Sequence, residues 1–357
     1  MDAPRNDVST EPPRFAPDAG GKTWTFASPA EANMDPAPLL QADEDIQKRF
    51  PKMRCFLVAK DGALVFERYY GGADASTRLD LRSATKSATA AVAACAGALG
   101  DDGGEKPPTL EALFPELLPR AASEDVRATT TRQLLAMTSG LHWKTGKRLG
   151  EAFVPRLHRS RHWVRFALRL PVDPETRGAF VYRSVDSHLL SAAVTAATGR
   201  PASDVAQEAI FGPLGIAPPP WEADPQGVTV GHIGLALTGR DLAKLGWLHA
   251  TGGVWEGRRI LPPDYVRLAF TPLGEGLPAF GRYGGHWWIA RAATGEAVRC
   301  ALGHGGQLVF VVPERRLAAV FAADPKVSRW KHPLSLFERY VLAADPDGPG
   351  AASPPPS

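Results

Sequence analysis

The segment Leu81–Gly100, LRSATKSATAAVAACAGALG, carries a lysine at the start of a long uncharged stretch. No charged side chain follows Lys86 before Asp101, and the residues between them are mostly alanine, with valine, cysteine and leucine. This composition predicts a helix that is buried on most of its faces. An unpaired ammonium group is costly to bury. Lys86 therefore needs a partner, and Ser83 stands three residues before it.

The spacing of Ser83 and Lys86 places both side chains on one face of the predicted helix. Apolar surroundings and the positive end of the helix dipole both disfavour the ammonium form of a lysine there. Such a lysine can act as a general base, and the neighbouring serine then becomes a nucleophile. In the structural alternative, Ser83 caps the helix and Lys86 extends to solvent. The short motif alone does not decide, but the strand hairpin before it and the uncharged helix after it favour catalysis.

The composition excludes several classes of partner. The chain has 357 residues, of which 44% are hydrophobic and 22% charged, as is typical of a globular protein of one or two domains. The formal net charge is +3 and the basic residues are scattered, so we expect no nucleic-acid and no membrane partner. No apolar run approaches the roughly 20 residues that span a bilayer.

The N-terminus and the cysteines bear on location. Residues 1–24 lack the basic segment and the apolar segment that together mark a secretory signal. The three cysteines, Cys55, Cys95 and Cys300, are far apart and odd in number, so we expect buried thiols in a reducing compartment. These features predict a cytoplasmic protein and give no indication of its oligomeric state.

Turn and periodicity signals divide the chain into sheet-forming and helical parts. Two β-favouring runs flank Asp61-Gly62, which predicts a hairpin leading into the Ser83 helix. Four apolar runs between residues 284 and 323 predict further strands, and residues 332–344 predict a closing amphipathic helix. The intervening pattern is helical, with start and stop signals of the kind expected at helix ends.

We therefore expect an α/β (α+β) fold, in which an antiparallel sheet flanked by helices carries an inserted all-helical subdomain. Residues 23–102 together with 273–345 are predicted to form the sheet-containing domain, and residues 103–272 the helical insertion. The two ends, residues 1–22 and 346–357, are rich in proline and are predicted to be disordered tails.

Five segments in a fixed order make the sequence recognisable. They are SATK at 83–86, LLAMTSGLHW at 134–143, FVYRSVDSHLLSAAV at 180–194, LTGRDLAKLGWL at 237–248 and GHGGQLVFVVP at 303–313. Together they resemble the serine β-lactamase and penicillin-binding protein superfamily, most closely its class C-like branch of esterases, D-amino-acid peptidases and 6-aminohexanoate-dimer hydrolases. The resemblance covers roughly Cys55 to Pro325 and implies a β-lactamase/transpeptidase-like fold.

The resemblance implies three catalytic elements. The family's S-x-x-K motif falls on Ser83 and Lys86. Its Tyr-x-Asn element, on a loop of the helical domain, falls on Tyr182-Arg183-Ser184. Its Lys-Thr-Gly element, on the strand that edges the cleft, falls on His304-Gly305-Gly306. Ser184, His304, Gly305 and Gly306 are thereby expected to bind substrate.

The same resemblance implies hydrolysis through an acyl-enzyme. The Ser83 hydroxyl would attack a carbonyl carbon while Lys86, together with Tyr182, removes its proton. Tyr182 would then pass a proton to the leaving group. The backbone N–H groups of Ser83 and Gln307 would form the oxyanion hole.

Two positions depart from the lactamase pattern. Ser184 replaces the asparagine, so a shorter hydroxyl stands where a side-chain amide could hold a substrate amide. His304 replaces the lysine, and a histidine is largely neutral near pH 7. Both changes argue against β-lactam hydrolysis and D-Ala-D-Ala recognition, and favour a carboxylesterase or small-amide hydrolase. Trp143 is a candidate for lining an apolar acyl pocket, with plain core packing as its alternative.

The sequence leaves two other functions open. One is a β-lactamase, D-aminopeptidase or DD-peptidase activity at the same site. The other is a non-catalytic binding protein that keeps the fold as a scaffold. The predicted partner is a small ester or amide substrate. We expect no cofactor, and no spacing among the histidines and cysteines suggests a metal site.

Overall fold

A computed structural model describes residues 24–100, 106–146, 149–326 and 334–345. The core is a nine-stranded sheet with the strand order β1-β3-β2-β13-β12-β11-β10-β9-β8. Its strands are β1 (Thr25–Phe26), β2 (Met53–Lys60), β3 (Ala63–Tyr69), β8 (Gly274–Leu277), β9 (Gly281–Tyr283), β10 (Trp288–Arg291), β11 (Ala297–Gly303), β12 (Gln307–Val312) and β13 (Leu317–Ala323). Every pair of neighbours is antiparallel except β1 with β3. The predicted antiparallel sheet is confirmed.

An early strand and the last strand of the chain pair within this sheet. β13 pairs with β2, so that Phe321 lies opposite Phe56 and the two rings stack. The β2–β3 hairpin turns at Asp61 and Gly62, whose φ angles are +50° and +92°. Asp-Gly is favoured there because both positions need a positive φ.

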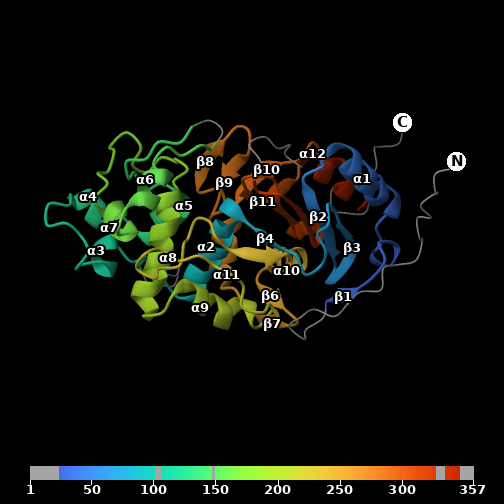
Figure 1. The fold of residues 1–357 in the computed structure, drawn as a ribbon, viewed down its shortest axis with the longest axis horizontal. Helices are drawn as coiled ribbons and strands as arrows, with labels where there is room; N and C mark the ends of the chain where they lie inside the picture. The colour runs from blue at the N-terminus through green and yellow to red at the C-terminus, as the bar shows by residue number, and fades with distance from the viewer. Residues whose placement is uncertain (1–23, 101–105, 147–148, 327–333, 346–357) are drawn as a thin grey trace.

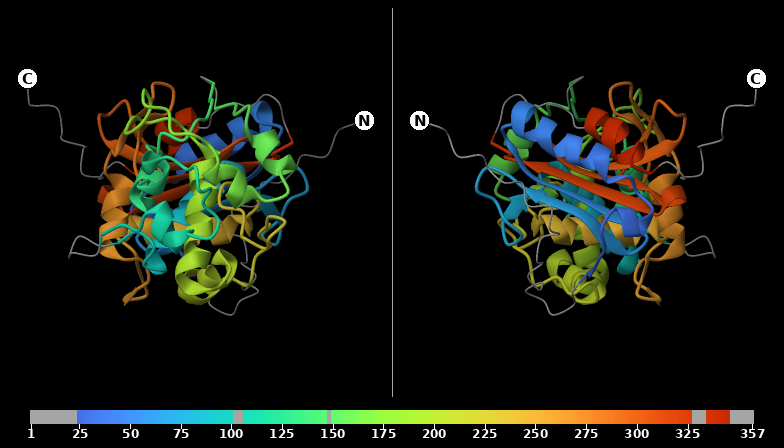
Figure 2. Two further views of the ribbon diagram at one scale, coloured as in Figure 1. Left: turned by 90° about the vertical axis from the view of Figure 1, so that its left-hand side faces the viewer. Right: turned by 90° about the vertical axis from the view of Figure 1, so that its right-hand side faces the viewer.

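Helices cover both faces of the sheet. Along β2, Phe56 and Val58 point into one apolar cluster, whereas Leu57 and Ala59 point into another. Successive strand residues alternate between faces, and the mostly apolar composition of β2 follows from burial on both sides. On the Phe56 side lie α1 (Pro36–Arg49) and the C-terminal helix, which comprises α12 (Leu334–Leu336) and the π-helical η5 (Phe337–Leu342). Figure 2 shows these blue and red helices together on one face.

The Leu57 side of the sheet is covered by α2 (Thr85–Cys95) and α10 (Gly239–Ala250). Thr238 and Asp241 form the capping box that starts α10. α10 packs on β13, β12 and β2, although it falls within the predicted helical insertion. The predicted domain boundaries stay predictions.

The remaining helices lie to the left of the sheet in Figure 1 or below it. They are α3 (Leu110–Leu113), α4 (Glu124–Arg127), α5 (Thr131–Ala136), α6 (Val154–Arg159), α7 (Trp163–Leu168), α8 (Ser184–Thr198), α9 (Ala202–Ala206) with the π-helical η3 (Gln207–Phe211), and α11 (Pro263–Phe270). The long helix α8 packs against both α2 and α5, and so links the helical part to the Ser83 helix. Two small ribbons complete the fold: β4 (Arg78–Asp80) with β5 (Ala236–Thr238), and β6 (Val254–Trp255) with β7 (Arg258–Arg259). No described helix is long and apolar enough to cross a bilayer.

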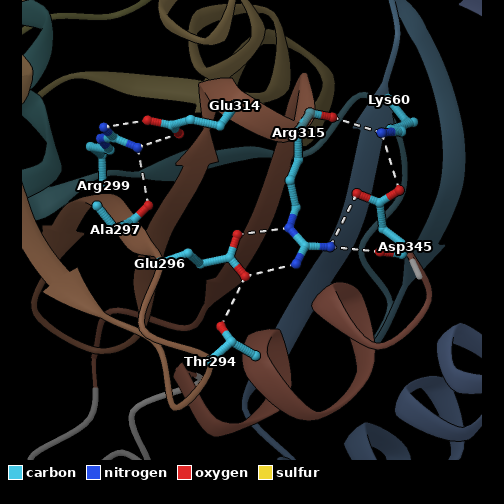
Figure 3. A network of polar contacts seen from close by, with 8 residues as sticks. All are labelled: Lys60, Thr294, Glu296, Ala297, Arg299, Glu314, Arg315 and Asp345. Carbon is cyan, nitrogen blue, oxygen red and sulfur yellow. Dashed lines mark hydrogen bonds and ion pairs between the residues drawn. The ribbon is translucent and has the colours of Figure 1, made fainter. Parts of the chain in front are cut away.

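A polar network ties the last described residues to the sheet (Figure 3). The ammonium group of Lys60 lies 3.1 Å from the Asp345 carboxylate and donates to the Arg315 carbonyl at 2.7 Å. The Arg315 guanidinium donates two hydrogen bonds to Glu296, at 2.7 and 2.8 Å, and one to the Asp345 carbonyl at 2.6 Å. Such paired, bidentate contacts are the usual way to accommodate buried charge.

Candidate active site

Ser83 lies in a 3-10 turn, η2 (Arg82–Ala84), which leads directly into α2. The residue is half-buried, so it is partly accessible to solvent rather than enclosed in the core. The end of β11 presses against this turn. A Cβ on Gly303 would lie 2.1 Å from the Leu81 carbonyl oxygen and 3.2 Å from the Ala84 nitrogen. The sheet edge can come this close to Ser83 only because residue 303 has no side chain.

Lys86 points from the first turn of α2 back toward Ser83. Its Nζ is 3.0 Å from the Ser83 Oγ and 3.2 Å from the backbone oxygen of His232. The side chain is only 1% exposed, so the alternative in which Lys86 extends to solvent does not apply. Burial lowers the pKa of Lys86 to about 8, against a smaller opposing effect of the Glu151 charge. A substantial fraction of this amine is therefore neutral at mildly alkaline pH.

Tyr182 closes the group from the other side. It precedes α8, is 4% exposed and shares a side-chain hydrogen bond with Ser83. The Lys86 Nζ lies 4.8 Å from the centre of its ring, which stacks on Trp288. Burial, together with the charge of Glu151, raises the pKa of Tyr182, so its hydroxyl keeps its proton near neutral pH. The structure thus brings Ser83, Lys86 and Tyr182 together.

Arg183, the middle residue of the Tyr182–Ser184 element, anchors this loop. Its guanidinium is buried and donates to the carbonyls of Leu141 (2.9 Å) and Met137 (3.0 Å) and to the Thr176 hydroxyl (3.0 Å). Met137 ends α5 with a φ of +56°, which turns its carbonyl toward the loop. The sequence assigned no role to this arginine.

Ser184 and Trp143, both predicted to bind substrate, converge instead on Glu151. The Glu151 carboxylate accepts hydrogen bonds from the Ser184 N–H (2.6 Å), the Ser184 hydroxyl (2.6 Å) and the Trp143 indole N–H (2.7 Å). Ser184 is the first residue of α8 and Trp143 is 6% exposed. No motif or spacing marked Glu151 in the sequence, because it lies 33 residues from Ser184.

The His304-Gly305-Gly306 element differs from the prediction in its local structure. Instead of lying on a strand, these residues form the turn between β11 and β12, with φ angles of +87° at Gly305 and +98° at Gly306. Glycine suits such angles, whereas a strand would not require it. His304 is exposed, and Gln307 begins β12 with its side-chain amide bonded to the Ala323 carbonyl at 2.6 Å. The turn follows Gly303 and so lies beside the Ser83 turn.

Further buried polar side chains lie near Ser83, Lys86 and Tyr182. Asp186 lies within the first turn of α8 and accepts a hydrogen bond from Ser139 at 2.8 Å. Burial raises the pKa of its carboxyl to about 7. His232, whose carbonyl holds Lys86, contacts His158 through its ring at 2.9 Å. In the described part of the chain, no three histidine, cysteine or acidic side chains come together as a metal site would require.

Comparison with known proteins identifies the family. A family model described as Beta-lactamase matches residues 47–329, which is most of the chain. The chain belongs to the beta-lactamase family. This family range includes Ser83, Lys86, Tyr182 and the 304–306 turn. None of the curated proteins compared with the chain matches it.

Solved structures of the beta-lactamase family share the fold. A family VIII carboxylesterase is similar with a TM-score of 0.67 and 18% identity, covering 90% of this chain and 98% of its own. A D-stereospecific amidohydrolase from a Streptomyces species has a TM-score of 0.62 and 18% identity, covering 86% and 98%. A penicillin-binding protein homologue from Caulobacter crescentus has a TM-score of 0.61 and 18% identity, covering 84% and 92%. Family membership and these neighbours support a serine hydrolase.

Proposed function

We propose that the protein is a serine hydrolase that cleaves a carboxylic ester or a small amide through an acyl-enzyme on Ser83. The observation that carries the proposal is the 3.0 Å contact between the Ser83 Oγ and the Nζ of the buried Lys86. A hydroxyl beside an amine whose pKa is lowered to about 8 is an activated nucleophile.

In the proposed mechanism, Lys86, Tyr182 and the oxyanion-hole N–H groups act both when the acyl-enzyme forms and when it is hydrolysed. Neutral Lys86 accepts the Ser83 proton as the oxygen attacks the carbonyl carbon. The backbone N–H groups of Ser83 and Gln307 stabilise the negative charge on the carbonyl oxygen. Tyr182, which keeps its proton, donates to the leaving alcohol or amine and is reprotonated from Lys86. A water molecule then attacks the acyl-enzyme along the same route in reverse.

The substrate preference follows from the two positions that depart from the lactamase pattern. Ser184 uses its hydroxyl on Glu151, and His304 stands exposed in a turn. Ser184 therefore offers no side-chain amide to a substrate, and His304 does not supply the fixed positive charge of a lysine that would hold a substrate carboxylate. We therefore favour esters and small amides over β-lactams and D-Ala-D-Ala peptides. The cytoplasmic location predicted from the sequence is also part of this proposal.

The first test is covalent labelling. A fluorophosphonate probe reacts with activated serines, so it should label wild-type protein at Ser83 and leave Ser83→Ala unlabelled. Lys86→Ala and Tyr182→Phe should each slow labelling on the order of 10²-fold. Folded wild-type protein that stays unlabelled would favour the non-catalytic binding protein instead.

The second test separates the hydrolase activities. We expect clear turnover of p-nitrophenyl butyrate, little or none of nitrocefin, and neither by Ser83→Ala. Nitrocefin turnover without ester turnover would assign the site to a β-lactamase. A D-alanyl-p-nitroanilide assay in parallel tests the D-aminopeptidase alternative.

A further inference from the structure

Glu151 lies close to the proposed catalytic group, because its carboxylate contacts Ser184, two residues after Tyr182. It is half-buried, and its carboxylate is fixed by the three donors from Ser184 and Trp143. One oxygen accepts two of these hydrogen bonds and the other accepts one. A carboxylate has about four acceptor positions, so Glu151 keeps the capacity to contact a further group.

The loop that carries Glu151 is built together with the loop that carries Tyr182. Thr145 pairs through its backbone with Glu151, and its hydroxyl donates to the Tyr182 carbonyl. The backbone at Glu151 is therefore tied to the backbone at Tyr182 through Thr145. The charge of Glu151 reaches the centre of the site, where it raises the pKa of both Lys86 and Tyr182.

Little positive charge opposes this carboxylate. The guanidinium of Arg183, the nearest arginine along the chain to Ser184, is turned away onto Leu141, Met137 and Thr176. Among the described residues, no ion pair includes Glu151. Lys86 contacts the nucleophile at 3.0 Å, and burial lowers its pKa to about 8, while the Arg82 guanidinium beside Ser83 pairs with Asp80 at 3.2 Å. The reaction requires neutral Lys86, and in that state the amine no longer offsets the Glu151 carboxylate.

We propose that Glu151 is a specificity-determining residue that selects substrates carrying a positive charge near the scissile carbonyl. The inference deepens the proposed function and rests on it. The substrate class is an ester or small amide with an ammonium group on its acyl or its leaving-group side. The cation contacts the Glu151 oxygen that has a free acceptor position, while Ser184 and Trp143 keep the carboxylate in place.

The variant Glu151→Gln removes the charge and preserves the shape. The Gln carbonyl can accept from the Ser184 N–H and the Trp143 indole, and its NH₂ can donate to the Ser184 hydroxyl. Glu175→Gln is the matched control, because Glu175 is an exposed acidic residue outside this hydrogen-bonded group. A residue that only caps α8 would affect stability in Glu151→Gln and leave charge preference unchanged.

The experiment compares isosteric substrates that differ in one charge. The first pair is butyrylcholine and its analogue with carbon in place of the quaternary nitrogen. The second pair places the same change at the end of the acyl chain of a p-nitrophenyl ester. For at least one pair, wild-type protein and Glu175→Gln should show kcat/KM on the order of tenfold higher for the cationic member. Glu151→Gln should lose this preference, and added salt should weaken it in wild-type protein.

Two outcomes overturn the inference. One is equal kcat/KM within both pairs in wild-type protein; the other is an unchanged preference in Glu151→Gln. Either leaves the proposed hydrolase intact, because esters are still cleaved.

If the protein hydrolyses none of these esters, the binding of non-hydrolysable analogues tests the inference instead. The butyl ether of choline and its carbon isostere cannot be hydrolysed, so calorimetry gives their affinities directly. Tighter binding of the cation by wild-type protein than by Glu151→Gln supports the inference even if the hydrolase proposal fails. Equal affinities overturn it.

Discussion

At the scale of single residues, the site depends on one buried amine. Lys86 is held between the Ser83 hydroxyl and the His232 carbonyl. The carbonyl accepts an N–H of the amine, whereas the hydroxyl can either accept an N–H or donate its own proton to the amine lone pair. Desolvation weakens the charged form, while Glu151 partly restores it. The working pH of the protein therefore reflects a balance between burial and one carboxylate.

This balance predicts the pH profile. Lys86 acts as a base only when neutral, so kcat/KM for a neutral ester should rise with pH and level off above about 8. Removing the negative charge of Glu151 lowers the pKa of Lys86, so Glu151→Gln should level off at lower pH than wild-type protein. Glu175→Gln should follow wild-type protein. A profile that is flat from pH 6 to 10 would exclude Lys86 as the base.

A second residue-scale prediction concerns Arg183. Arg183→Met removes the side-chain donor of the Leu141 carbonyl and leaves the Met137 carbonyl with the Val181 N–H alone, which should cost about 2–4 kcal/mol of unfolding free energy. Because the loop also carries Tyr182, kcat should fall on the order of tenfold, with KM little changed. Arg169→Met, at an exposed position, is the control. Wild-type kcat in Arg183→Met would mean that the arginine does not position the tyrosine.

At the scale of elements, local signals predicted most of the pieces. The Asp61-Gly62 turn, the capping box at Thr238 and the glycine after α8 each act within a few residues, and each appears in the structure. Local signals do not indicate which residues distant in the sequence will come into contact. No residue spacing in the sequence predicts the packing of α10 on the sheet or the contact of Glu151 with Ser184.

Two elements were also mispredicted or missed, for physical reasons. The 304–306 segment was assigned to a strand by resemblance, but its consecutive glycines have φ angles that only a turn accommodates easily. The helix α1 was not predicted, although Asp35 caps it and Pro36 is its first residue. That start signal lies in a proline-rich region, where proline is equally typical of an extended chain.

The element-scale prediction concerns the contact between β11 and the Ser83 turn. A methyl group in Gly303→Ala would meet the backbone at Leu81 and Ala84, so either the strand or the turn must shift. We expect a loss of about 1–3 kcal/mol in unfolding free energy and slower fluorophosphonate labelling. Gly150→Ala, where the added methyl meets no atom within 4 Å, is the control. Labelling at the wild-type rate in Gly303→Ala would show that this contact does not shape the site.

At the scale of the whole molecule, a single sheet joins the beginning of the chain to its end. The S-x-x-K turn follows β3 by way of β4, whereas the strands that flank it come from beyond residue 296. The site is therefore complete only when the C-terminal strands have paired with β2. The last described residues hold this arrangement through Asp345, which joins Lys60 at the end of β2 to Arg315 before β13.

The contacts of Asp345 predict that a single substitution at this residue lowers the unfolding free energy strongly. Asp345→Asn removes the closer of the two carboxylates that pair with Lys60; the other, on the more exposed Asp61, lies 3.7 Å away. Lys60 is only 8% exposed, so its buried ammonium group loses the better part of its compensation. We expect urea unfolding to show a loss of about 3–5 kcal/mol. Glu44→Gln breaks the exposed Lys48 pair and should cost about 0–1 kcal/mol. Because the network joins elements other than those carrying Ser83 and Tyr182, folded Asp345→Asn should keep wild-type kcat. Equal losses in the two variants would mean that solvent, rather than Asp345, stabilises the Lys60 charge.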